Sequence, residues 1–232
     1  MKISRRQMLA STALAGLFSP FASVLSQQKA APWRNWSGGQ VCYPSGRFSP
    51  ASEAELQDFL RRTSGEIRPV GSGHSFSALV PTDGHLIVID QLSGLLDHDA
   101  QTLQATFGAG TRLGDMGEPL ARIGQAMLNL PDIDRQTLAG ATATATHGTG
   151  IAFTCLSGYV TSLRLVTPDG DVIDTSPTSN SDLFDAARVS LGALGIVTQM
   201  TLQNRAPYKL KAKNWVQPIE EVLETFDESA AN

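Results

Sequence analysis

Apolar positions between residues 33 and 207 follow two spacings, one typical of helices and one typical of strands. Ser52 and Glu55 form a capping box with apolar residues at helical spacing behind it, which predicts a helix ending at Arg62. Two further helices are expected at 113–123 and 182–189. Short apolar runs predict strands at 41–43, 67–70, 86–90, 102–107, 160–166, 172–175 and 196–202. Because strands and helices mix without strict alternation, the pattern favours an α+β fold over a doubly wound sheet.

Residues 208–232 have a different pattern from the body. A short strand is predicted at Asn214–Val216 and an acidic amphipathic helix at 219–226. Neither segment has an evident packing partner in the preceding sequence. We therefore expect residues 208–232 to be the start of a C-terminal substrate domain, the rest of which is missing from the chain.

The first thirty residues are typical of an export signal. Lys2, Arg5 and Arg6 precede a moderately apolar stretch, and the segment from Ser4 to Leu9 resembles a twin-arginine signal with Met8 in place of the usual Phe. Pro20 and scattered serines leave no run of about 18 apolar residues, which disfavours the alternative, a membrane anchor. We expect residues 1–30 to direct the folded protein to the periplasm or the exterior, with no stable membrane anchor.

Charge and cysteine content exclude several classes of partner. The formal charge of the chain is −4, and without residues 1–30 it becomes −8, from 14 basic and 22 acidic residues. Such an acidic body argues against nucleic-acid binding. Cys42 and Cys155 show no metal-ligand spacing, so we expect two separate buried thiols and no metal site.

A glycine-rich segment follows the strand predicted at 67–70. In Gly71-Ser72-Gly73 the backbone N–H groups can approach a phosphate closely, because glycine has no Cβ. The lysine of a P-loop is absent. A nicotinamide dinucleotide fold gains support from Asp90 at a strand end, but Phe76 stands where its third glycine belongs, and 75–84 contains Pro81 and cannot form the required helix.

A second constellation spans residues 139–150. It combines small side chains, three hydroxyls at alternate positions, His147 and flanking glycines. Its backbone could lie flat against a large ligand while the hydroxyls donate hydrogen bonds. The alternative is a tightly packed segment in which His147 is an ordinary core histidine. Taken together, the two glycine-rich segments indicate two walls of one elongated cofactor site.

Residues 33–207 resemble the PCMH-type FAD-binding domain of the vanillyl-alcohol-oxidase superfamily, in its aldonolactone and alditol oxidase branch. The matching segments are 70–76, 139–150 and 191–198, and the segments 33–38 and 165–170 also fit. The resemblance implies two α+β subdomains, at about 33–92 and 93–207, with FAD between them and the first glycine segment around the diphosphate.

The resemblance also implies individual site residues. His74 matches the histidine that this branch commonly links covalently to the flavin 8α-methyl group, and its alternative is a plain turn histidine. Asp132 falls where alditol oxidases place a serine near the flavin, which argues against an alditol substrate, although an ordinary loop aspartate would look the same. The expected cofactor contacts are Val70, Gly71, Ser72, Gly73, His74, Ser75, Phe76, Asp132, Thr137, Gly140, Thr144, Ala145, Thr146, His147 and Ile196.

The resemblance implies the activity as well. It predicts an FAD-dependent oxidoreductase that oxidises a sugar lactone or polyol, with hydride passing to flavin N5 and on to oxygen or another acceptor. In this branch the proton-abstracting residues mostly come from the C-terminal domain, so no catalytic base is assigned here. The alternatives are a non-catalytic or split FAD-binding fragment that needs a partner chain and, more distantly, a nicotinamide enzyme.

Overall fold

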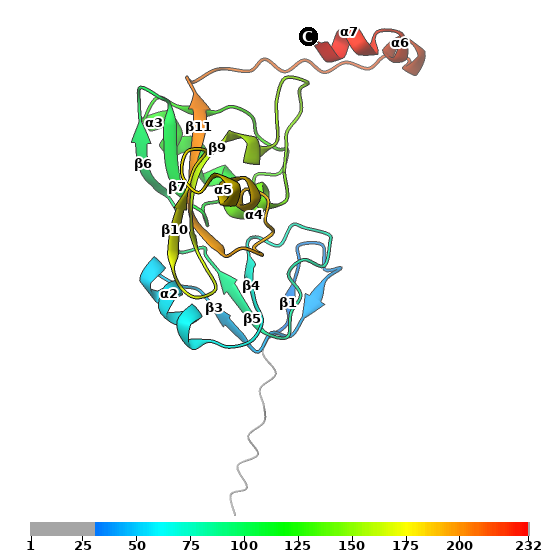
Figure 1. The fold of residues 1–232 in the computed structure, drawn as a ribbon. Coiled ribbons are helices and arrows are strands. Elements are labelled where there is room, and N and C mark those ends of the chain that lie inside the picture. The colour runs from blue at the N-terminus through cyan, green and yellow to red at the C-terminus, as the bar shows by residue number, and fades with distance from the viewer. Residues whose placement is uncertain (1–30, 232) are drawn as a thin grey trace, which may run out of the picture.

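Two stacked lobes make up the body of the molecule, one on a small parallel sheet and one on a larger antiparallel sheet (Figure 1). The computed structural model describes residues 31–231. The predicted export signal, residues 1–30, lies outside the described residues. The mixture of helices with separate parallel and antiparallel sheets confirms the expected α+β class.

The first lobe contains the three-stranded parallel sheet in the order β3-β5-β4, with Val70 opposite Val88. A two-stranded antiparallel ribbon precedes this sheet, and helix α2 lies beside it (Figure 1). Carboxyl ends of parallel strands meet at one edge, so β4 delivers the first glycine segment to that edge. The elements are β1 (Trp33–Arg34), β2 (Val41–Cys42), β3 (Gly46–Phe48), α2 (Glu53–Arg62), β4 (Ile67–Val70) and β5 (His85–Val88).

Helix α2 begins where the capping box predicts. The Ser52 hydroxyl accepts a hydrogen bond from the Glu55 N–H at 3.2 Å, while the Glu55 carboxylate accepts one from the Ala51 N–H at 2.8 Å. The reciprocal bond therefore reaches one residue further back than in the standard capping box. Leu56 and Leu60 are buried on the face that packs against the sheet.

The second lobe contains the larger antiparallel sheet, in the order β10-β9-β11-β7-β6, with β8 paired to the end of β11. Burial alternates along β11, and Met200 lies between Phe107 and Leu163 of its two neighbours. The strands are β6 (Leu95–Asp99), β7 (Gln104–Gly108), β8 (Ala126–Met127), β9 (Val160–Val166), β10 (Val172–Thr175) and β11 (Ile196–Arg205). The helices are η1 (Leu113–Asp115), α3 (Gly117–Arg122), α4 (Leu138–Ala143), η2 (Leu156–Tyr159) and α5 (Ser181–Ala187).

Several predicted elements differ from the structure. The helix expected at 113–123 is divided into η1 and α3, because Gly114 and Gly117 weaken a continuous helix there. The strand predicted at Asn214–Val216 is wrong: residues 206–217 form no helix or strand, and Trp215 and Val216 are exposed without a neighbouring strand among the described residues. A strand without a partner leaves its backbone groups unpaired.

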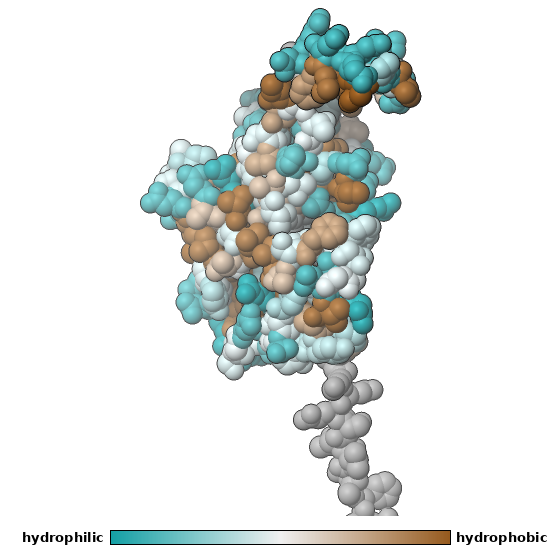
Figure 2. Space-filling view, turned by 90° about the vertical axis from the view of Figure 1, so that its right-hand side faces the viewer, coloured by the Kyte–Doolittle hydropathy of each residue, from teal (hydrophilic) through white to brown (hydrophobic). Residues whose placement is uncertain are grey.

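The C-terminal segment lies away from the two lobes (Figure 1). The single helix expected at 219–226 is two short helices, α6 (Ile219–Glu224) and α7 (Phe226–Ala231). Apolar side chains gather on one side of this segment (Figure 2). The large exposed apolar residues of 206–231 are Tyr208, Leu210, Trp215, Val216, Ile219, Leu223 and Phe226.

One of three apolar clusters in the core contains residues of both lobes. A single cluster combines Leu56, Leu60 and Ile87 of the first lobe with Val166 and Ile196 of the second. A second cluster fills the antiparallel lobe around Phe107, and a third lies under β4 and β5. Because the first cluster belongs to both lobes, burial of apolar surface holds them together.

Candidate cofactor site

A cavity lies between the two lobes, where the segment after β4 faces helix α4. Both glycine-rich segments singled out in the sequence contribute to its walls. A third wall comes from the end of α5 and the start of β11. The lining comprises residues 69–75, 79–80, 89, 136–137, 139–140, 142–144, 187, 190–192, 195–197 and 200.

Close backbone approach explains the first glycine segment. Gly73 has φ +70°, in the left-handed region that other residues rarely adopt, and its carbonyl accepts a hydrogen bond from the Trp36 N–H at 2.8 Å. A Cβ added at Gly71 would overlap the Thr137 hydroxyl and lie 3.7 Å from Gly140 Cα. The two glycine-rich segments are therefore in direct contact across the lobe boundary.

Thr137 caps the start of helix α4, because its hydroxyl accepts a hydrogen bond from the Gly140 N–H at 3.2 Å. The first part of the second constellation, Leu138–Ala143, is thus helical, and the expectation that residues 139–150 lie flat is wrong there. The small side chains of this helix let it approach the first glycine segment closely. Leu138 and Ala141 point into the core, while Ala139, Gly140 and Ala143 line the cavity.

His74 lies in the cavity wall with an unpartnered nitrogen. Its Nδ1 atom is buried and has no hydrogen-bond partner. Its ring stacks on Trp36 with centroids 5.8 Å apart and an angle of 20° between the planes. A buried polar atom without a partner is costly, so this nitrogen fits a site in which a bound group contacts it.

Charged side chains are missing from this lining. Among the described residues that line the cavity, His74 is the one titratable side chain, and the polar remainder consists of hydroxyls, one amide and backbone groups. A diphosphate held here would be bound by N–H and O–H donors rather than by ion pairs. The apolar lining residues, among them Leu79, Val80 and Met200, suit the flat ring of a flavin.

Ten of the residues expected to contact a cofactor line the cavity. They are Val70, Gly71, Ser72, Gly73, His74, Ser75, Thr137, Gly140, Thr144 and Ile196. The other five lie outside the lining, and their contacts with a cofactor stay predictions: Phe76, Asp132, Ala145, Thr146 and His147.

Two of these five lie at different places relative to the cavity. Thr146 is one contact removed from the cavity, because its hydroxyl accepts a hydrogen bond at 3.0 Å from the amide of Gln136, which does line it. His147 is exposed, and its Nδ1 lies 2.9 Å from the carbonyl oxygen of Gly148. The reading of His147 as a core histidine is therefore wrong.

The sequence predicts only Ile196 in the wall formed by residues 187–197, although the segment 191–198 matches a motif of the family. Gly192, with φ +77° and close to Pro69, and Gly195, with φ +142°, both line the cavity. Glycines flanking a predicted strand start were the available signal.

Both cysteines are free thiols, as expected. Cys42 is buried, whereas Cys155 is only partly buried, so the expectation of burial is wrong for Cys155. A hydrogen bond with the Ser157 hydroxyl lowers the pKa of the Cys155 thiol.

Within residues 31–231 no group of three or more His, Cys, Asp or Glu side chains could hold a metal ion. No helix in that part of the chain is long and apolar enough to cross a membrane.

Several curated proteins are similar in sequence to this chain. L-gulono-1,4-lactone dehydrogenase of Mycobacterium tuberculosis (strain ATCC 25618 / H37Rv) is 44% identical over 199 residues, covering 84% of this chain and 46% of the relative. L-gulonolactone oxidase of Mus musculus is 34% identical over 202 residues, covering 86% and 46%. D-arabinono-1,4-lactone oxidase of Yarrowia lipolytica is 34% identical over 201 residues, covering 84% and 38%.

The chain therefore spans about half the length of the curated relatives it matches, or less. Residues 44–176, more than half of the chain, match a protein family described as FAD binding domain. The family match includes both glycine-rich walls of the cavity, but not the wall at 187–197, and it names the ligand of the family, FAD. The chain belongs to this family of FAD-binding domains.

Proposed function

We propose that this chain is the FAD-binding part of an oxidoreductase that oxidises a sugar-derived lactone or polyol. The names of its relatives, which include lactone oxidases and a lactone dehydrogenase, support this substrate class. The observation that carries the proposal is the cavity between the lobes, with its uncharged lining and the unpartnered His74 Nδ1. FAD bound there supplies a two-electron acceptor for the substrate, and oxygen or another acceptor removes the electrons.

The residues of this chain bind and orient the cofactor. Backbone N–H groups of Gly71–Gly73 and the Thr137 hydroxyl provide donors for the diphosphate, whereas the Thr144 hydroxyl already donates to the Gly140 carbonyl at 3.0 Å. Apolar side chains on both lobes exclude water from the ring, which strengthens every polar contact inside the cavity.

We further propose that His74 forms a covalent bond with the flavin. The parent protein should then keep flavin fluorescence on a denaturing gel. His74→Ala should lose that fluorescent band while still binding FAD reversibly. His98→Ala, which changes an exposed histidine of β6, is the matched control and should keep the band. Flavin that stays attached in His74→Ala would disprove the assignment.

The substrate class can be tested with the full-length flavoprotein under anaerobic conditions. Sugar lactones such as D-arabinono-1,4-lactone should bleach the flavin absorbance faster than alditols do. Restoring colour with oxygen or with an artificial dye then identifies the class of acceptor. Tightly bound flavin that neither lactones nor polyols reduce would favour the alternative, an FAD-binding part that needs a partner chain.

We also propose twin-arginine export, on the sequence of residues 4–9. Changing Arg5 and Arg6 to Lys keeps the charge of the segment and should leave the protein in the cytoplasm of a bacterial host. Cell fractionation followed by immunoblotting measures the outcome. Normal periplasmic yield of the double variant would contradict this route.

A further inference from the structure

A β-bulge in β11 lies beside the cofactor cavity. Val197 pairs with Leu165 and Gln199 pairs with Arg164, so Thr198 is an extra residue between two consecutive pairs. A bulge bends its strand and re-aims the residues beside it. The residues immediately before this bulge, Gly195, Ile196 and Val197, line the cavity. The position of the bulge therefore sets the position of that wall.

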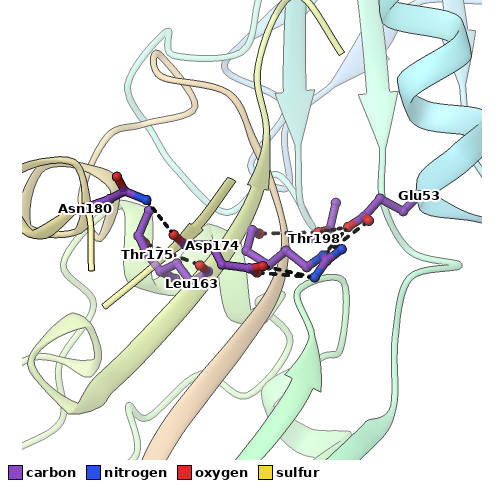
Figure 3. Close-up of polar contacts among 7 residues, drawn as sticks. Glu53, Leu163, Asp174, Thr175, Asn180 and Thr198 are labelled. Atoms are coloured by element: carbon purple, nitrogen blue, oxygen red, sulfur yellow. Dashed lines mark hydrogen bonds and ion pairs between the residues drawn. The ribbon is translucent and has the colours of Figure 1, made fainter. Parts of the chain in front are cut away.

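The buried hydroxyl of Thr198 is bound by a residue of the other lobe. Thr198 is only 2% exposed, and its Oγ1 donates to Glu53 Oε2 at 2.8 Å, a shorter contact than the 3.3 Å to the Arg164 carbonyl. The single N–H of Arg164 Nε is shared between both oxygens of the same carboxylate, at 3.1 and 3.2 Å. Figure 3 shows Glu53 reaching from α2 to Thr198, with Asp174 on the opposite side of the network. The Glu53 hydrogen bond raises the pKa of the Arg164 guanidinium, which is charged at every accessible pH.

Glu53 is the first member of a polar stripe on α2. Residues four and eight positions later lie on the same helix face. Gln57 and Arg61 both donate to the Gly170 carbonyl at 2.8 Å, in the turn between β9 and β10. The stripe thus binds the second lobe at two points, the bulge and the turn.

This stripe adds directional hydrogen bonds to a contact between the lobes that is otherwise apolar. The shared core around Leu56 and Ile196 holds the lobes together, but apolar burial has no directional preference. Hydrogen bonds of 2.8 Å fix position far more narrowly, because they weaken steeply with distance and angle. Charge-assisted bonds to a carboxylate are the stronger kind.

We propose that Glu53 is a positioning residue for the FAD cavity. By holding the bulge at Thr198, its carboxylate fixes the Gly195–Val197 wall of the second lobe against the Gly71–His74 wall of the first. The inference rests on FAD binding in this cavity and does not depend on which substrate is oxidised. Glu53 acts through Thr198, since it does not itself line the cavity.

The test is the affinity for 8-demethyl-FAD of the full-length apoprotein, produced in a riboflavin-starved host so that no flavin is attached to His74 beforehand. This probe lacks the methyl carbon at which a covalent link would form, so its binding stays reversible in every variant. Glu53→Ala and Thr198→Val should each raise its Kd by about tenfold or more, the effect of losing one hydrogen bond to a charged group. Glu53→Gln and Thr198→Ser keep an acceptor and a donor, and their Kd should stay within about threefold of the parent.

Asp58→Asn is the matched control, because Asp58 lies on the same helix in an exposed ion pair with Arg62. Its Kd should not change. The double variant Glu53→Ala/Thr198→Val should bind no more weakly than the weaker-binding single variant, because both changes break the same contact. The visible circular dichroism of the bound flavin should change in Glu53→Ala and recover in Glu53→Gln.

All titrations are made well below the thermal midpoint of each variant, and far-UV circular dichroism confirms folding. A Glu53→Ala protein with a lower midpoint but a Kd within twofold of the parent would overturn the proposal, since Glu53 would then serve stability alone. If Glu53→Ala does not fold, the same comparison of thermal midpoint and Kd is made for Thr198→Val. A parent that binds the probe but whose flavin is reduced by neither lactones nor polyols would refute the proposed function and leave this inference intact.

Discussion

Replacing Gly71 by alanine tests the contact between the two glycine-rich segments. The added Cβ would overlap the Thr137 hydroxyl, well inside the 3.0 Å below which such contacts essentially never occur. Thr137 is only 6% exposed, so its side chain has little room to withdraw. The same hydroxyl caps α4 through the Gly140 N–H. Any relief of the overlap therefore disturbs the helix start.

The expected cost combines two terms. Loss of a threonine cap costs about 1 kcal/mol, and forcing one extra methyl group into a packed site costs about 1–3 kcal/mol. Gly71→Ala should therefore lower the free energy of unfolding by about 3 kcal/mol. For a body of this size each kcal/mol shifts Tm by about 2–4 °C, so Tm should fall by about 6–12 °C.

Urea unfolding of the flavin-depleted protein, followed by tryptophan fluorescence, measures this change directly. Gly39→Ala is the control, because its nearest neighbour would be Ser37 Oγ at an ordinary 3.5 Å. It should change the stability by less than about 0.5 kcal/mol.

Thr137→Ala removes the atom that the new Cβ would meet. The two remaining neighbours, the Cβ of residue 137 at 3.5 Å and Gly140 Cα at 3.7 Å, are at ordinary distances. The double variant Gly71→Ala/Thr137→Ala should therefore cost about as much as Thr137→Ala alone. If the two single costs simply add in the double variant, the steric reasoning is refuted.

Three further predictions concern stability. Leu56→Ala removes a fully buried side chain from the shared core and should cost about 2–5 kcal/mol in urea unfolding, and a cost below about 1 kcal/mol would contradict its place there. Ser52→Ala removes the hydroxyl that accepts the Glu55 N–H and should cost about 1 kcal/mol, whereas Ser52→Asp should cost little. Hydrogen bonds from the backbone, chiefly the Gln101 N–H, lower the pKa of Asp99, so its carboxylate stabilises the fold above the ordinary carboxyl pKa and less as pH falls below it. The stability difference between the parent and Asp99→Ala should therefore be full at about pH 7 and shrink below about pH 4, and a difference that grows on acidification would contradict this sign.

Elements with local signals were predictable from the sequence. The capping box of α2, the apolar run of β4 and the turn between β9 and β10 all depend on residues within a few positions of one another. The two-residue strands β1 and β8 are too short to display a periodicity and were not predicted, whereas β2, equally short, was expected within residues 41–43. Strand β6 was not predicted, because four of its five residues are exposed and three of these, Asp97, His98 and Asp99, are polar.

The candidate site divides in the same way. Composition singles out Gly71–Gly73 and residues 139–150, because both are rich in glycine or small hydroxyl residues, whereas the assignment of His74 and Thr137 to the site depends on the family resemblance. The contact of Glu53 with Thr198 joins residues 145 positions apart. No local pattern encodes a contact of that separation, since it follows from the packing of α2 against β11.

The shared core of Leu56, Ile87, Val166 and Ile196 has a thermodynamic consequence. Neither lobe can unfold without exposing apolar surface of the other, so both should open in a single cooperative transition. Amides of β5 and β11 should accordingly show the same free energy of opening in hydrogen exchange. Reversibly bound FAD at 100 times its Kd would add about 2.7 kcal/mol to that common value. Loading the cofactor thus protects the whole body against global unfolding, including strands that never touch it.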